Sequence, residues 1–216
     1  MKKMVLMMVV SVLTISMFAQ SEKYIKAMEK IVPDVETTTT AAGFTALANS
    51  FQRIADAEKT QWLPYYYAAL CNVFAVYYTE GGPSGMGTAA DPIADKAEAL
   101  LNKADELKKD NSEIYCVKKM IASLRLTVDP MNRYMTYGPA ATQALTKAKQ
   151  LDPDNPRVYL LEGQDKFYTP AEFGGSKEEA KKLFEQAKNK MEAFTPESSI
   201  HPSWGKAQVE YFLSQG

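Results

Sequence analysis

The stretch 141–187 reads ATQALTKAKQLDPDNPRVYLLEGQDKFYTPAEFGGSKEEAKKLFEQA and decides the fold. A small, a large and a small apolar residue follow one another at steps of four and three in its first part, and its last part repeats that spacing. The members are Ala141, Leu145 and Ala148, then Ala180, Phe184 and Ala187. Steps of three and four residues place side chains on one face of an α-helix. The stretch therefore predicts amphipathic helices that pack closely through their small residues.

The same spacing occurs earlier in the chain. A clear copy lies at Ala97, Leu101 and Ala104, and a looser copy lies at Leu47, Phe51 and Ile54. Small residues on such a face let a neighbouring helix approach, and the large residue fills the remaining gap. No strand-like alternation of polar and apolar residues competes with this pattern. We therefore expect an all-α fold.

These stripes, together with the connector LDPDNP at 151–156 and the helical pattern that follows it, resemble the tetratricopeptide repeat. The resemblance is best over 141–187, weaker over 64–107, and extends over most of the chain. It implies a short right-handed α-solenoid of stacked antiparallel helix pairs, and such arrays usually hold a peptide or partner protein on their concave face. The stripes begin at residues 97, 141 and 180, farther apart than the family's unit of about 34 residues.

The extra length falls in three connections inside the predicted pairs, 79–92, 128–139 and 169–175. Connections inside pairs leave from one end of a stack, so we expect all three loops to share one edge. Loops longer than packing requires are candidates for function.

Aromatic residues and one arginine in or beside these loops form the predicted docking edge. They are Tyr78, Arg133, Tyr134, Tyr137, Tyr168 and Phe173. We expect this edge to continue onto the inner face through Tyr66, Arg157 and Gln164. Two plainer alternatives stay open: the loops pack on one another, and Arg133 ties down its own loop through Asp129.

The amino terminus has the layout of a secretory signal peptide. Lys2 and Lys3 precede an apolar run over 4–18, and Ala19-Gln20 leads into a charged segment. We expect residues 1–20 to be removed and residues 21–216 to form a single helical domain, exported to the periplasm or secreted. An uncleaved anchor is the alternative. Cys71 and Cys116 are expected to be buried free thiols, although an oxidising compartment also permits a disulfide.

Composition and motifs argue against several kinds of site. The net charge of −1 gives no reason to expect nucleic acid as a partner. One histidine, His201, cannot supply a histidine cluster for a metal, and the glycine-rich stretch 81–87 lacks the lysine and hydroxyl of a phosphate loop. Acidic residues lie among lysines, as on a solvated helix face. We therefore expect no catalytic residues, no cofactor and no metal.

The leading hypothesis is a non-enzymatic, exported scaffold that binds a protein or peptide. The alternative is a periplasmic small-molecule-binding or transport-associated protein, with an aromatic pocket under the long loops. An enzyme that uses paired carboxylates is the third hypothesis. An extended apolar groove would favour the first, and a pocket with convergent polar groups would favour the second.

Overall fold

The computed structural model describes residues 22–215, and this part of the chain is all-α, without a β-strand. The predicted signal peptide and its cleavage site lie outside the described residues. Within them, no helix is both long and apolar enough to cross a membrane.

Helices follow one another with short connections. A helix over residues 22–31 comes first. It is followed by α2 (Asp34–Thr37), α3 (Ala41–Glu58), α4 (Trp62–Tyr77), α5 (Gly82–Met86), the 3-10 helix η1 (Gly87–Ala90), α6 (Asp91–Leu107), α7 (Ser112–Val128), α8 (Pro130–Leu151), α9 (Pro156–Tyr168), the 3-10 helix η2 (Ala171–Phe173), α10 (Lys177–Ala193) and α11 (Lys206–Ser214).

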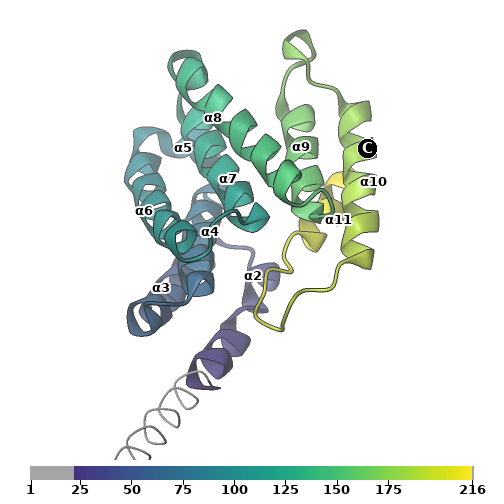
Figure 1. Ribbon diagram of the computed structural model, residues 1–216. Coiled ribbons are helices and arrows are strands. Elements are labelled where there is room, and N and C mark those ends of the chain that lie inside the picture. Colours follow the sequence, from purple (N-terminus) through teal and green to yellow (C-terminus); the bar gives the residue numbers. More distant parts are fainter. Residues whose placement is uncertain (1–21, 216) are drawn as a thin grey trace, which may run out of the picture.

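The longer helices pack as consecutive pairs (Figure 1). Helix α4 packs on α6, α7 on α8, and α9 on α10, while α7 also contacts both α4 and α9. Helix α7 thus lies between α4 and α9, and we call these three helices the inner row; α6, α8 and α10 each pack on one of them. The predicted stripes hold these helices together, since Ala97, Ala104, Ala180, Phe184 and Ala187 are at most 1% exposed.

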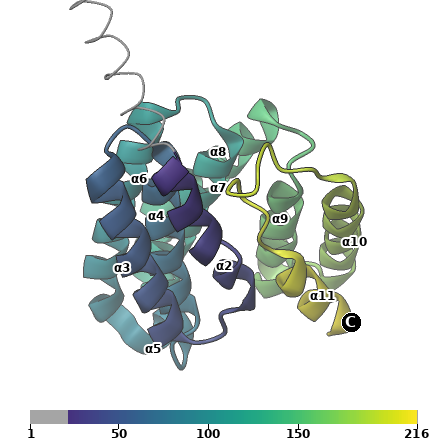
Figure 2. The same cartoon turned by 90° about the horizontal axis from the view of Figure 1, so that it is seen from below.

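The carboxyl-terminal segment turns back toward the amino-terminal helices before α11 (Figure 2). Ile200 accepts a hydrogen bond from the hydroxyl of Tyr67 at 3.1 Å. The backbone N–H of Gly205 donates to Glu36 at 2.8 Å. Through these contacts the segment before α11 lies against α2 and α4, and α11 then packs on α10.

The structure corrects the prediction of a loop over 128–139. Only Asp129 separates α7 from α8, and α8 continues through Pro139. The Asp129 side chain accepts a hydrogen bond from the backbone N–H of Asn132, and Pro130 takes the first helical position, where its missing N–H costs little. These two residues begin a helix where we expected a loop.

The connection 79–92 is likewise built mostly of α5, η1 and the start of α6, and 169–175 contains η2. The first two connections lie together, because Ser84 donates to the carbonyl of Thr127 at 2.8 Å. The α9–α10 connection lies at the same end of the stack (Figure 1). The expected common edge is therefore present, although most of it is helical.

Cys71 and Cys116 are buried free thiols, as predicted. Burial raises the pKa of both thiols well above the ordinary value. Both cysteines pack into the core between the inner helices and make no disulfide.

Candidate functional site

A buried polar network joins the inner helices to the carboxyl-terminal segment. Glu113 of α7 accepts hydrogen bonds from the hydroxyl of Tyr66 at 2.9 Å and from Arg157 at 3.1 Å. Tyr66 in turn accepts from the indole of Trp204 at 2.8 Å. Burial raises the pKa of the Glu113 carboxyl, while Arg157 and the hydrogen bonds from Tyr66 and Asn155 oppose that rise. The network fixes the ends of α4, α7 and α9 that lie away from the long connections.

Arg157 is held inside this network and is 1% exposed. Its Nη2 donates to the carbonyl of Pro202 at 2.6 Å, and its guanidinium lies 5.5 Å from the ring centre of Trp204. Its Nε is the one buried side-chain nitrogen or oxygen of residues 22–215 that lacks a hydrogen-bond partner. Tyr66 and Arg157 are therefore core residues, whose polar atoms are used by this network.

The opposite end of the inner row carries a group of exposed tyrosines, which we call the tyrosine rim. It consists of Tyr77 and Tyr78 at the end of α4, Tyr168 at the end of α9, and Tyr211 on α11. Their exposed fractions are 36%, 40%, 68% and 56%, so Tyr168 and Tyr211 are the most open of the four residues.

Several contacts bring the rim together. Asp165 and Tyr168 contribute to the raised pKa of Tyr77, and Tyr211 contributes to that of Tyr168, so these groups lie near one another. The ring of Phe212 lies 5.8 Å from that of Tyr168 and 5.3 Å from that of Tyr211. Tyr78 shares a hydrogen bond with Gln208 of α11. Helix α11 therefore closes the rim between α4 and α9.

Three of the rim phenols, those of Tyr77, Tyr78 and Tyr168, are neutral at physiological pH. Burial raises the pKa values of Tyr77, Tyr78 and Tyr168 above the ordinary value of a phenol. Each of these side chains consequently offers an uncharged ring, and Tyr168 also offers a hydroxyl. Such side chains suit a ligand that is flat and apolar with polar groups at its edge.

An ion pair lies beside Tyr77. The ammonium of Lys119 on α7 is 2.6 Å from Asp165 on α9. Lys119 is 3% exposed, whereas the side chain of Asp165 is 50% exposed. The hydroxyl of Tyr77 donates to the carbonyl of the next residue, Met120, at 3.4 Å. A buried cation thus lies below the rim, with its carboxylate partner facing solvent.

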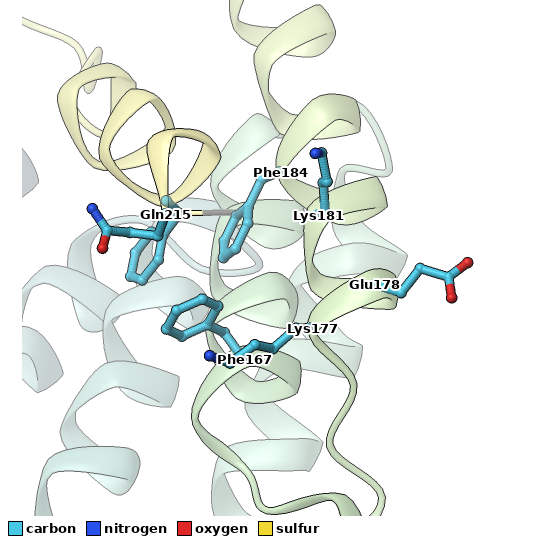
Figure 3. Close-up of a pocket in the computed structure, with 7 residues that line it drawn as sticks. Phe167, Lys177, Glu178, Lys181, Phe184 and Gln215 are labelled. Carbon is cyan, nitrogen blue, oxygen red and sulfur yellow. The ribbon is translucent and has the colours of Figure 1, made fainter.

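Two hollows adjoin the rim through the neighbouring aromatic residues. The first, about 180 Å³, lies among Phe167, Phe184 and Phe212, with Lys177 and Gln215 at its edge (Figure 3). The second, about 310 Å³, is lined by the α9–α10 connection and includes Tyr168. The stacked rings of Phe184 and Phe212, with centres 4.6 Å apart, form the wall of the first hollow behind the rim. Aromatic surface therefore extends from the rim to α10.

Comparisons with protein-family models and with curated proteins find no match. Among solved structures, the chain is similar to the HusA haemophore from Porphyromonas gingivalis, with 35% sequence identity and a TM-score of 0.76. The match covers 89% of this chain and 92% of that chain. The chain belongs to the HusA family. This HusA family member thus shares its helical fold with a haemophore.

Two of the nine predicted residues, Tyr78 and Tyr168, belong to the tyrosine rim of this HusA family member. The structure corrects the placement of Tyr66 and Arg157, because both are fully buried in the polar network rather than open on the inner face. Arg133 forms a bidentate pair with Asp91, at 2.7 and 2.8 Å, which supports the plainer alternative but with a different partner from Asp129.

The other four predicted residues lie apart from one another or make no common site. Tyr134 is exposed on α8, and the ring of Tyr137 lies 5.8 Å from the guanidinium of Arg125. Phe173 is exposed in η2, and Gln164 is partly buried on α9. Tyr134 and Tyr137 therefore lie on α8, whereas Gln164 and Phe173 lie on α9 and η2.

Sequence reasoning missed Tyr77, Tyr211, Lys119 and Asp165. Tyr77 lies in a helix with several other tyrosines and Tyr211 in the last helix, so neither has a distinguishing signal in the sequence. Lys119 and Asp165 are 46 residues apart, and only the packing of α7 on α9 brings them together. A lysine within the apolar pattern of α7 was the one available signal.

The histidine and cysteine side chains do not reach the rim. The ring of His201 is engaged on both nitrogens, by Ser198 at 2.8 Å and Glu197 at 3.2 Å, and burial lowers its pKa. Across residues 22–215, no three His, Cys, Asp or Glu side chains gather in an arrangement that could hold a metal ion.

Proposed function

We propose that this chain is an exported haem-binding protein that carries haem against the tyrosine rim. The observation that carries the proposal is the similarity to the HusA haemophore, at 35% identity over 89% of this chain. An identity of this size over nearly the whole of both chains supports a shared ligand class more than a shared architecture alone does.

The chemistry of the rim fits such a ligand. Haem is a flat, largely apolar ring with two carboxylate side chains. Neutral aromatic rings can cover its faces, and hydroxyls and cations can meet its edge. The rim and the adjoining hollows offer rings from Tyr77, Tyr168 and Phe212, and they offer cations from Lys119 and Lys177.

Contact with the ring faces supports binding here better than ligation of the iron. Proteins usually hold haem iron through histidine, cysteine, methionine or tyrosine. In this chain His201 is engaged on both nitrogens, both cysteines are buried, and the exposed Met131 and Met135 lie on α8, which carries none of the rim tyrosines. The rim offers tyrosine, but the raised pKa values of Tyr77 and Tyr168 disfavour the phenolate that binds iron. Stacking on neutral rings is then the main source of affinity.

This proposal replaces the scaffold hypothesis with its small-molecule alternative. The protein acts by binding and delivery rather than by catalysis, and export would place it where haem is captured. The tetratricopeptide-like solenoid remains our proposal for the geometry of the helix pairs, because it accounts for the inner row that carries the rim.

Titration of the purified protein with haemin tests the proposal. We expect a saturable shift of the haem absorption band at one defined stoichiometry, together with quenching of the two tryptophans. An absorbance change that rises without saturation, as when haemin adsorbs to a surface, would refute it.

A further inference from the structure

The ion pair between Lys119 and Asp165 lies where a ligand on the rim would have its edge. Asp165 is three residues before Tyr168 on α9, a spacing that places both on one helix face. The charge of Asp165 also acts on the phenol of Tyr77. The pair therefore lies between two of the four rim tyrosines.

The two partners differ in their access to solvent. Lys119 lies on α7 in the inner row and is 3% exposed. Because its ammonium is shielded from water, it requires a nearby anion. The side chain of Asp165 is 50% exposed. A carboxylate that arrives from solvent can therefore reach the ammonium from the side that Asp165 occupies.

We infer that Lys119 anchors a carboxylate of the ligand, and that Asp165 is the counter-ion which this carboxylate displaces. The inference rests on the proposed function, since it assigns the carboxylate-recognising residue of the same site. A ligand carboxylate has the charge and the acceptor geometry of the Asp165 side chain. Exchange of one for the other keeps the buried ammonium paired, and Asp165 can swing into water.

This exchange makes opposite predictions for the two residues. Removing the cation removes the anchor, so Lys119→Met weakens binding of a carboxylate ligand. Removing the competing anion leaves the cation unpaired in the free protein, so Asp165→Asn strengthens that binding. If the ion pair only held α7 against α9, neither substitution would change the affinity for a carboxylate ligand more than the affinity for the same ligand without carboxylates.

The test uses metal-free protoporphyrin IX and its dimethyl ester, which present the same ring with and without free carboxylates. Affinities are measured by quenching of tryptophan fluorescence in one dilute-detergent buffer. Lys118→Met is the matched control, because Lys118 is the neighbouring lysine on α7 and pairs with Asp105 of α6 at 3.1 Å, away from the rim.

We expect Lys119→Met to bind the diacid about tenfold more weakly or worse, as expected when one member of a charge pair is lost. Asp165→Asn binds the diacid about fivefold more tightly, the effect of removing one like charge at contact distance even in water. Both variants bind the diester as the wild-type protein does, and Lys118→Met leaves both affinities unchanged.

Two results would overturn the inference while leaving the proposed function standing. One is a wild-type protein that binds both probes, with Asp165→Asn unchanged or weakened for the diacid. The other is a Lys119→Met variant that loses both probes equally. Asp165→Asn alters an exposed side chain, so it decides the matter even if Lys119→Met does not fold. A wild-type protein that binds neither probe nor haemin would refute the proposed function itself.

Discussion

Trp204 donates its indole N–H to the hydroxyl of Tyr66 at 2.8 Å, across a separation of 138 residues in the chain. Trp204 is 2% exposed, and its ring also packs edge-on against Phe74 at 5.5 Å. This contact ties the carboxyl-terminal segment to α4. Because α11 begins two residues later, the contact also places Tyr211 beside the rest of the rim.

Trp204→Phe tests this role. The variant keeps an aromatic ring but removes the donor and leaves a small void, so we expect the free energy of unfolding to fall by about 1–3 kcal/mol. Urea unfolding followed by circular dichroism measures the change. Trp62→Phe is the control, since Trp62 is only partly buried. Equal losses for the two variants would argue against a special role for the Trp204–Tyr66 contact.

Two helical glycines should respond differently to substitution by alanine. A Cβ at Gly163 would lie 2.6 Å from Cε1 of the buried Phe184, which is stacked on Phe212 and cannot move freely. Gly163→Ala should therefore cost about 1–3 kcal/mol through overpacking.

At Gly138 the nearest atom to a Cβ is on the exposed ring of Tyr134, at 3.3 Å. That ring can turn aside, but a Cβ on Gly138 would also meet the Cδ of Pro139, which follows it in α8. This clash offsets the roughly 0.5–1 kcal/mol that alanine gains in helix propensity, so Gly138→Ala should leave stability nearly unchanged. Thermal melts of both variants check the difference. Stabilisation by Gly163→Ala would mean that α9 and α10 cross less closely than described.

The pair formed by Arg133 and Asp91 predicts a defined pH dependence of stability. The hydrogen bonds from Arg133 hold the pKa of Asp91 below its ordinary value of 3.8. A carboxyl with a depressed pKa contributes stability above its ordinary range, and that contribution is lost as the pH falls through the depressed value. Asp91→Asn should thus lower the melting temperature near neutral pH, and the difference should vanish in strong acid.

Haem affinity gives a second readout for this pair. Because Arg133 is held by Asp91 on the α8 side of the molecule, Arg133→Met should bind haemin as the wild-type protein does. Reduced haemin affinity in a folded Arg133→Met variant would indicate that haemin binds beside α8 instead of at the tyrosine rim.

Local sequence signals predicted the helices and much of the core, because these depend on residues a few positions apart. Ser176 caps α10 by accepting from the backbone N–H of Glu179 at 3.1 Å, as their spacing predicts. Asp129 and Pro130 are a helix-start signal for α8. The sequence nevertheless favours a loop there, because Pro139 is unfavourable inside a helix, yet α8 continues through it.

The site could be predicted only in part, because it depends on where distant segments meet. Tyr78 and Tyr168 were identified from their place beside long connections. Tyr211 joins them only because the carboxyl-terminal segment folds back onto α4, and no local spacing encodes that return. Arg157 is the opposite case. Its guanidinium suggests a ligand contact from the sequence, but in the structure it donates to Glu113 and to the carbonyl of Pro202 inside the core.

The most direct test of haem binding at the tyrosine rim compares two exposed tyrosine surfaces. Tyr168 on the rim and Tyr134 on α8 are similarly open, at 68% and 62% exposed, so neither substitution should unfold the protein. Haemin titrations of a Tyr168→Ala, Tyr211→Ala double variant and of Tyr134→Ala give the comparison. We predict that the rim variant binds haemin about tenfold more weakly or worse, the loss expected for central aromatic contacts, while Tyr134→Ala matches the wild-type protein. Wild-type affinity in the rim variant, together with weakened binding in Tyr134→Ala, would contradict the account.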